Sequence, residues 1–494
     1  MAEEAKQGQA ESTAATVETG TLDQILEVTK IAKNDWEREQ SKRQIATVVE
    51  EALKGTFRVS KDVEATIKAR VADIDRLLTD QLNAIMHAPD FQKLEGSWRG
   101  LHYLVMQSET STTMKIRVLN VSKNDLIKDL EKAVEFDQSA LFKKVYEEEY
   151  GTFGGAPYGA LIGDYEFGKH PQDFSLLEKL SNVAAAAHAP FISAAAPSLL
   201  GLDTFTDLPN PRDLAKKFEA VDYAMWKSFR ESEDSRYVGL TLPHVLMRLP
   251  YGPDTVPVEA FDFREDVDGK DHSKYCWGNA AYAFGARLTD AFAKYGWCAA
   301  IRGVEGGGRV DGLPTHTFRT DEGEIALKCP TEIAITDRRE KELSDLGFIP
   351  LVHCKGTDFA AFFGAQSAQK GKKYDTAAAT ANARLSTQLQ YMMAMSRFAH
   401  YLKSIMRDKI GSFMTRKDCE DFLTRWIKNY VISTEDAGQE LKAKYPLKEA
   451  RIEVSEIPGK PGCYRAVSYL KPHFQLDEIT ISLRLVAELP PPAK

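Results

Sequence analysis

The chain has 494 residues, 43% of them hydrophobic and 10% aromatic, so it can bury a core and is not disordered as a whole. Its formal net charge of −8 argues against binding to phosphate backbones, which requires an excess of Lys and Arg. No signal peptide or apolar run of about 18 residues is present, and the six cysteines form no C-x-x-C pair. We therefore expect a cytoplasmic protein with no nucleic acid partner, membrane insertion, disulfide framework or zinc site.

Residues 1–20 are rich in Ala, Glu, Gln and Thr, which predicts a disordered tail. Residues 21–88 are predicted to form a helical arm. Apolar residues recur in this arm at steps of three and four, among them Val63, Ile67, Val71 and Ile74, so they share one helix face. Two interpretations fit this face equally well: it packs on the core of its own chain, or a partner helix lies against it.

Residues 90–106 are predicted to form a helix. Within it, a pair of charged residues and a pair of glycines are each four residues apart, which is about one helical turn. One face carries four apolar residues: Leu94, Trp98, Leu101 and Val105. Glu95 and Arg99 are one turn apart and can pair. Gly96 and Gly100 are also one turn apart, although each Gly costs a helix about 1 kcal/mol relative to Ala. Two glycines on one face indicate that another backbone packs closely there, which is a structural requirement rather than a catalytic one.

Helix and strand periods then alternate along the body of the chain. Met114, Ile116 and Val118 alternate with Lys115 and Arg117, as in a strand. Further strands are predicted at 158–163, 190–194, 237–242, 298–302 and 348–352. Helices are predicted at 175–188, 211–230, 278–295, 337–346, 380–410 and 416–430. This alternation favours an α/β class with mixed α+β character, in a body that spans residues 89–375.

The last part of the chain, residues 376–494, reads as long helices followed by a β-meander. Extended segments at 451–454 and 463–470 flank the turn residues 458–462. The clearest alternation comes at the end, where Ile479, Ile481, Leu483 and Leu485 are separated by single residues. A terminal strand of this kind pairs within its own sheet or with the strand of a neighbouring chain.

No motif for catalysis or cofactor binding is found. The chain lacks a Walker A sequence, a G-x-G-x-x-G fingerprint and H-E-x-x-H, and the three glycines at 306–308 favour a flexible loop. Triads can assemble from distant positions, so the missing motifs only remove the positive reasons for proposing an enzyme. We predict no enzyme activity, with no catalytic residues, no cofactor and no metal ligands.

The segment 94–101 (Leu94, Glu95, Gly96, Ser97, Trp98, Arg99, Gly100, Leu101) resembles the signature of the large subunit of the bacterial type VI secretion contractile sheath, the TssC/VipB/EvpB-like family. The resemblance continues in order through residues 120–123, 161–165, 236–240, 277–279 and 330–332. It extends from about residue 20 to the end of the chain, and chain length agrees.

The resemblance implies a multi-domain contractile tail-sheath-like fold without an active site. Family members pair with a small sheath subunit, and these heterodimers stack as six-membered rings into a helical tube around inner-tube protein hexamers. Contraction of the sheath drives the inner tube into a target cell and delivers effectors, and a baseplate is a further partner. A hexameric AAA+ ATPase then disassembles the sheath.

For this chain, the resemblance implies an arm that pairs with the small subunit through Val63, Ile67, Val71 and Ile74. It implies strand exchange in an inner sheath domain, residues 376–494, through Ile479, Ile481, Leu483 and Leu485.

Two other functions are consistent with the sequence. A phage-like contractile tail sheath protein usually forms its tube from one chain, so a requirement for a second, smaller subunit would distinguish the two devices. A cytosolic hydrolase of unrecognised type would need a pocket with converging titratable groups.

Overall fold

The computed structural model describes residues 35–53, 63–320, 322–412, 414–434, 436–458 and 463–475. The chain divides into two units, each described here by itself. The first contains the segments up to Ile85 together with residues 251–265, and the second contains residues 86–250 and the chain from residue 266 onward. None of the helices in the described segments is both long and apolar enough to cross a bilayer.

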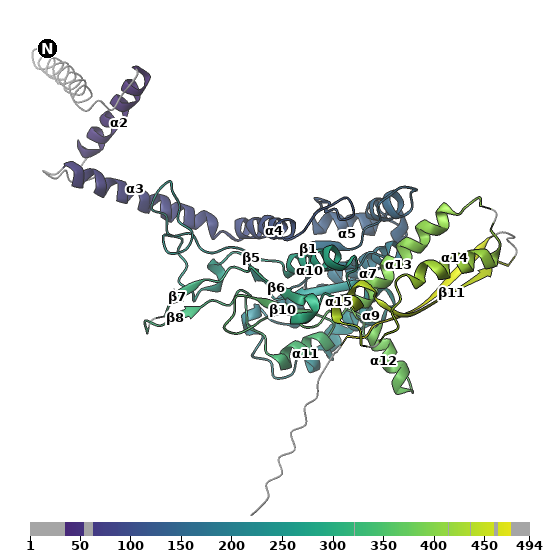
Figure 1. Ribbon diagram of the computed structural model, residues 1–494. Helices are drawn as coiled ribbons and strands as arrows, with labels where there is room; N and C mark the ends of the chain where they lie inside the picture. Colours follow the sequence, from purple (N-terminus) through teal and green to yellow (C-terminus); the bar gives the residue numbers. More distant parts are fainter. Residues whose placement is uncertain are drawn as a thin grey trace, which may run out of the picture. The chain divides into compact units, whose positions relative to one another are not determined.

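Figure 1 shows the helices and strands and labels most of them. The α-helices are Asp35–Leu53 (α2), Val63–Met86 (α3), Pro89–Met106 (α4), Lys123–Lys132 (α5), Ala140–Phe142 (α6), Pro171–Ala187 (α7), Leu214–Phe218 (α8), Ala224–Glu231 (α9), Ala280–Tyr295 (α10), Asp337–Asp345 (α11), Ala377–Leu385 (α12), Leu389–Asp408 (α13), Arg416–Lys428 (α14) and Gln439–Lys444 (α15). The strands are Leu161–Phe167 (β1), Phe191–Ala195 (β2), Val238–Leu242 (β3), Val245–Leu246 (β4), Trp277–Gly278 (β5), Arg309–Val310 (β6), Thr317–Arg319 (β7), Ile325–Leu327 (β8), Ile349–His353 (β9), Ala360–Phe362 (β10), Leu447–Glu456 (β11) and Tyr464–Pro472 (β12).

A six-stranded sheet in the order β1-β2-β3-β9-β10-β6 forms the centre of the second unit. The first four strands are parallel, β10 pairs antiparallel with β9, and β6 pairs antiparallel with β10 and so runs in the direction of the first four. Phe191 packs in one hydrophobic cluster with residues of α7, whereas its neighbour Ile192 packs in another with residues of α10. Adjacent strand residues point to opposite faces, so α7 and α10 cover opposite faces of the sheet.

The C-terminal part of the second unit combines α13, α14 and the β11–β12 hairpin around a separate cluster. Leu447, Ile452 and Val454 of β11 are buried against Leu423 and Ile427 of α14. Trp297 reaches into the same cluster and stacks on Phe398 of α13 with a ring-centroid distance of 4.3 Å. This aromatic contact fastens the hairpin region to the segment that follows α10.

The α/β class is confirmed, and most predicted elements occur close to their expected bounds. Two predicted helices are each broken in two. The helix expected at 380–410 is interrupted after Leu385, where Thr387 Oγ1 donates to Arg384 O at 2.7 Å and competes with helical pairing. The helix expected at 211–230 is interrupted between α8 and α9, where the Phe218 and Tyr223 rings pack 4.6 Å apart in the core.

Two predicted strands are wrong. Residues 298–302 form no strand, because the apolar run ends at Gly303, whose φ of 74° turns the chain away. Residues 114–118 form no strand either, although their apolar and charged residues alternate as in a strand. No described strand lies beside them to complete a ladder of hydrogen bonds.

Candidate assembly surfaces

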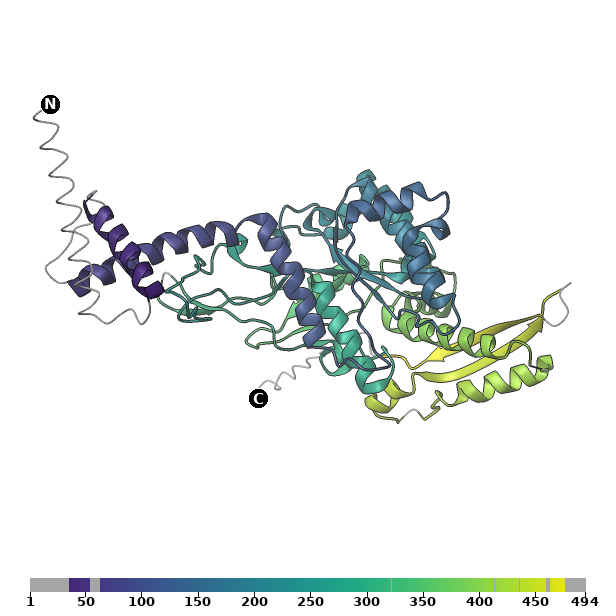
Figure 2. The same cartoon turned by 90° about the horizontal axis from the view of Figure 1, so that it is seen from above.

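Helix α4 packs closely against other elements of the second unit through its two glycines. A Cβ atom at Gly96 would overlap the backbone carbonyl of Trp277 in β5, and a Cβ atom at Gly100 would overlap the ring of Tyr282 in α10. Both glycines are buried, and Figure 2 shows α4 lying beside α10. The segment around Gly96 is therefore held close to a second backbone, and that around Gly100 to an aromatic side chain.

A half-buried ion cluster fixes the same helix. Glu95 Oε1 accepts hydrogen bonds from Arg99 Nε and from Arg248 Nε, each at 2.7 Å, and Arg248 Nη2 donates to Glu95 Oε2 at 3.3 Å. Burial by itself would raise the pKa of Glu95, but the hydrogen bonds and charges of Arg248 and then Arg99 outweigh it and hold that pKa below its usual value. The carboxylate is thus the charged centre that joins α4 to the strand region around Arg248.

The opposite face of α4 leaves apolar side chains in solvent. Trp98 is 66% exposed, and Leu94 and Val105 are exposed as well. Large apolar side chains of this kind, grouped on one helix face, are typical of a surface that another element covers.

A groove of about 730 Å³ runs along this face. Its lining includes Trp98 and Leu101 from α4, Ile116 and Val118 from the segment between α4 and α5, and Phe292 from α10. The N-terminal half of β1 also contributes to it, through Ile162 and Asp164. The groove therefore lies between a helix face and the outer strand of the sheet.

The first unit carries its own exposed apolar stripe, on α3. Ile67, Val71, Ile74 and Leu78 recur at steps of three and four and are all exposed, with Ile67 at 58%. Val63 begins the same helix. Within the described part of the unit, Asn83 Nδ2 donates to Arg264 O at 3.2 Å, which attaches the helix to residues 251–265.

The β11–β12 hairpin offers an open strand edge. Along β11, Arg416 Nη1 donates to Val454 O at 3.2 Å, and Glu420 Oε2 accepts from Val454 N at 3.2 Å, so side chains of α14 cover that edge. Among the described strands, β12 pairs with β11 alone, so its outer edge can accept a further strand. The predicted exchange strand, with Ile479, Ile481, Leu483 and Leu485, lies outside the described residues.

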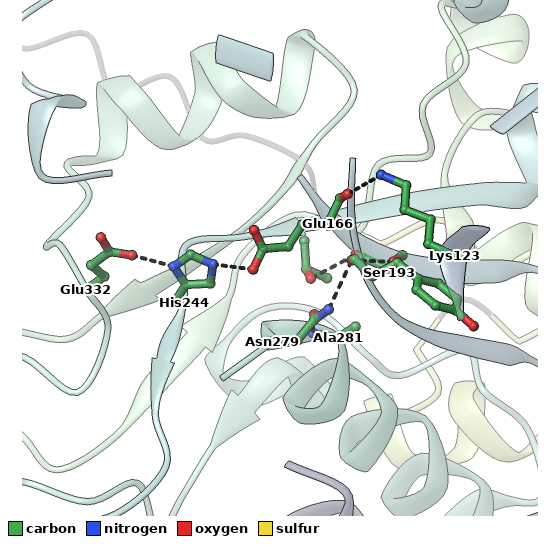
Figure 3. A network of polar contacts seen from close by, with 9 residues as sticks. Lys123, Glu166, Ser193, His244, Asn279, Ala281 and Glu332 are labelled. Atoms are coloured by element: carbon green, nitrogen blue, oxygen red, sulfur yellow. Dashed lines mark hydrogen bonds and ion pairs between the residues drawn. The ribbon is translucent and has the colours of Figure 1, made fainter. Parts of the chain in front are cut away.

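A polar network crosses the end of the sheet (Figure 3). His244 follows β3, and its Nδ1 lies 2.6 Å from Glu332 Oε2 while its Nε2 lies 2.9 Å from Glu166 Oε1. Both ring nitrogens face carboxylates, so both carry protons. Burial alone would lower the pKa of His244, but the hydrogen bonds to Glu166 and Glu332, with their charges, raise it to about 10. The result is an imidazolium, 19% exposed, that links β1, the end of β3 and the segment at Glu332.

Two family models match this chain. The EvpB/VC_A0108 tail sheath N-terminal domain matches residues 68–369, and the EvpB/VC_A0108 tail sheath gpW/gp25-like domain matches residues 378–489. The chain is also 51% identical over 493 residues to the type VI secretion system sheath protein TssC1 of Pseudomonas aeruginosa, with 99% of each chain covered. This chain belongs to the EvpB/VC_A0108 tail sheath family. It is a sheath subunit of the type VI secretion system, which confirms the family predicted from residues 94–101.

A solved structure also resembles this sheath subunit. The cryo-EM structure of the anti-feeding prophage helical sheath in its contracted state aligns with a TM-score of 0.32 and 8% sequence identity. The alignment covers 63% of this chain and 66% of that chain.

Sequence reasoning found the signature helix of this sheath subunit but missed its partners. Arg248, Trp277 and Tyr282 hold α4 in place, and none of them was predicted to do so. A signal for Arg248 was present, because a single Arg stands within the apolar run 245–249 and a charge in such a run requires a partner. In the described part of the sheath subunit, no group of three or more His, Cys, Asp or Glu side chains could hold a metal ion.

The His244 network predicts a defined pH dependence. The folded pKa of about 10 lies above the ordinary value of 6.5, so the stabilisation is fully present below pH 6.5 and is lost as the pH rises toward 10. Replacing His244 by Gln should therefore lower the free energy of unfolding most at pH 6. The difference from wild type should shrink by up to ~1 kcal/mol per pH unit on the way to pH 10. Urea unfolding of wild type and His244→Gln at pH 6 and pH 9.5 measures this difference in the free energy of unfolding. A difference that does not change with pH would contradict a charged His244.

Proposed function

We propose that this sheath subunit pairs with the small sheath subunit through the exposed stripe of α3, and that the heterodimers stack as six-membered rings around an inner tube. The main support is the 51% identity to a type VI sheath protein across 99% of both chains. The stripe of Ile67, Val71, Ile74 and Leu78 adds to it, because an exposed apolar face at helical spacing fits a partner helix. The role is structural, and the chain carries out no reaction of its own.

The proposed sheath works by contraction in the cytoplasm. Contraction is driven by energy stored in packing during assembly, rather than by nucleotide hydrolysis at the moment of contraction. The extended sheath is therefore metastable, and contraction increases the contact area between rings. The proposed further partners are the hexamers of the inner tube, a baseplate, and an AAA+ ATPase that disassembles the contracted sheath. Strand exchange at the β11–β12 hairpin keeps neighbouring subunits linked while they rotate.

A charge on the α3 stripe should prevent pairing. Replacing Ile74 by Asp places a carboxylate in an interface that becomes dry on binding, which should weaken binding of the small subunit at least about tenfold. Ala72 is exposed on the other side of the same helix, so Ala72→Asp introduces an identical charge away from the stripe and serves as the matched control. Co-purification of the two co-expressed chains measures the effect.

Equal recovery of the small subunit with Ile74→Asp and with wild type would remove α3 from the interface. Equal losses with Ile74→Asp and Ala72→Asp would show that charge on the helix, rather than the stripe, is responsible. A tube formed by this chain alone would instead favour the phage-like alternative, in which one chain is sufficient.

A further inference from the structure

Residues 115–120 form an extended segment whose backbone is open. In the described part of the chain, no backbone N–H or carbonyl of these six residues has a hydrogen-bond partner. Backbone hydrogen bonds hold the chain just outside the segment, where Ser111 N donates to Met114 O at 2.9 Å and Tyr165 Oη donates to Val121 O at 2.7 Å. Within the segment, the contacts are made by side chains: Ile116 packs beside Leu104 and Tyr282, and Arg117 pairs with Glu149. Val118 is 67% exposed, and Leu119 is exposed beside it. An extended, unpaired and apolar segment is the usual template for a strand from another chain.

The surroundings of the segment provide a place for such a strand. The groove of about 730 Å³ is lined by residues of α4, of the segment 115–120 and of the outer strand β1. Side chains already cover carbonyls at the C-terminal end of β1, where Lys123 Nζ donates to Glu166 O at 2.7 Å and Asn279 Nδ2 donates to Tyr165 O at 3.2 Å. The N-terminal half of β1 contributes Ile162 and Asp164 to the lining of the groove.

The charges along the groove favour an acidic occupant. Lys115 is exposed, and within the described residues no ion pair involves it. The buried Nε of Arg397 has no hydrogen-bond partner in the described structure, and it lies in the lining as well. Arg117 pairs with Glu149, whose charge Lys115 also meets, and Arg397 lies over the rings of Phe292 and Tyr401. The lining therefore carries Lys115, Arg117 and Arg397 against one acid, Asp164, and within the described residues no ion pair involves Lys115 or Arg397. Carboxylates on the occupant would complement both cations.

We propose that a β-strand of a second protein adds to residues 115–120, with apolar side chains turned toward Trp98 and carboxylates turned toward Lys115 and Arg397. The added strand supplies the ladder partner that this segment lacks and covers the apolar face of α4. The inference rests on the proposed function, because the second protein is the small sheath subunit. It gives that subunit a second contact with this chain, made through the backbone.

Two adjacent proline variants test the pairing. Successive N–H groups of a strand point to opposite edges, so an added strand uses the N–H of Val118 or of Leu119 but not both. Val118→Pro and Leu119→Pro each remove one donor, and both residues are exposed, so the fold should survive as checked by circular dichroism. We expect one of the two to bind the co-expressed small subunit about tenfold more weakly and the other to bind as wild type. Val118→Thr and Leu119→Thr keep the N–H and should both bind normally.

Hydrogen exchange of the wild-type chain, alone and with the small subunit, gives the second readout. Amides of residues 115–120 should exchange rapidly in the chain alone and become protected in the heterodimer, while β11 amides serve as the internal reference. Binding by wild type without new protection, or with both proline variants unaffected, overturns the strand addition and leaves the proposed function standing. Failure of the wild-type chain to bind the small subunit at all overturns the proposed function itself.

Discussion

Replacing Ile481 by Pro should abolish sheath tubes while leaving the heterodimer with the small subunit intact. Ile481 is the second of four apolar residues that alternate along the C-terminal segment, and Pro removes the N–H that a strand ladder requires. The proposed acceptor is the outer edge of β12, which lacks a second neighbour among the described strands. Loss of a linking strand acts at every junction of the polymer, so the effect on assembly is expected to be close to complete.

The control for this variant is Ile481→Val, which keeps the N–H and a β-branched side chain and should form tubes. Electron microscopy of each variant co-expressed with the small subunit measures tube formation, and co-purification measures pairing. Tubes of normal length from Ile481→Pro would show that exchange through this segment does not link the subunits.

Replacing Glu95 by Gln should lower the free energy of unfolding by about 3 kcal/mol. The side chain of Arg248 is 7% exposed, and the substitution leaves this buried guanidinium and Arg99 without the carboxylate that both contact. An exposed pair offers the matched control: Glu449 and Lys471 lie 3.0 Å apart on the hairpin surface. Glu449→Gln should change stability by less than about 0.5 kcal/mol.

The same substitution has a pH signature. The pKa of Glu95 is held below its usual value, so its contribution is present above about pH 4.5 and is lost as the pH falls through the folded pKa. Urea unfolding at pH 7 and pH 4 should therefore show a smaller difference between wild type and Glu95→Gln in acid. Equal unfolding midpoints for Glu95→Gln and Glu449→Gln at pH 7 would refute the role of the ion cluster.

Local patterns predicted much of the fold. The periods of residues 161–195 and 280–295 identified β1, α7, β2 and α10, because each element has one strong period and a clear end. In the structure, α10 ends at Gly296, whose φ of 73° is one that residues other than glycine rarely adopt. The strand predicted at 114–118 was wrong, because pairing depends on a neighbouring strand that the residues of the segment do not specify.

The assembly surfaces were predicted less completely, for a physical reason. A spacing of four places Gly96 and Gly100 on one helix face, but the identity of what packs there depends on Trp277 and Tyr282, which lie more than a hundred residues away. The ion pair of Glu95 with Arg99 is local and could be predicted, whereas Arg248 joins it only through the tertiary fold. The domain bounds and the strand-exchange residues remain predictions.

The central claim is that this chain builds a sheath only together with a smaller subunit. Negative-stain electron microscopy of the chain expressed alone, and then with the small sheath subunit encoded beside it, tests this claim most directly. We predict hollow tubes in the second sample and none in the first. Discrete particles in both samples would contradict the account.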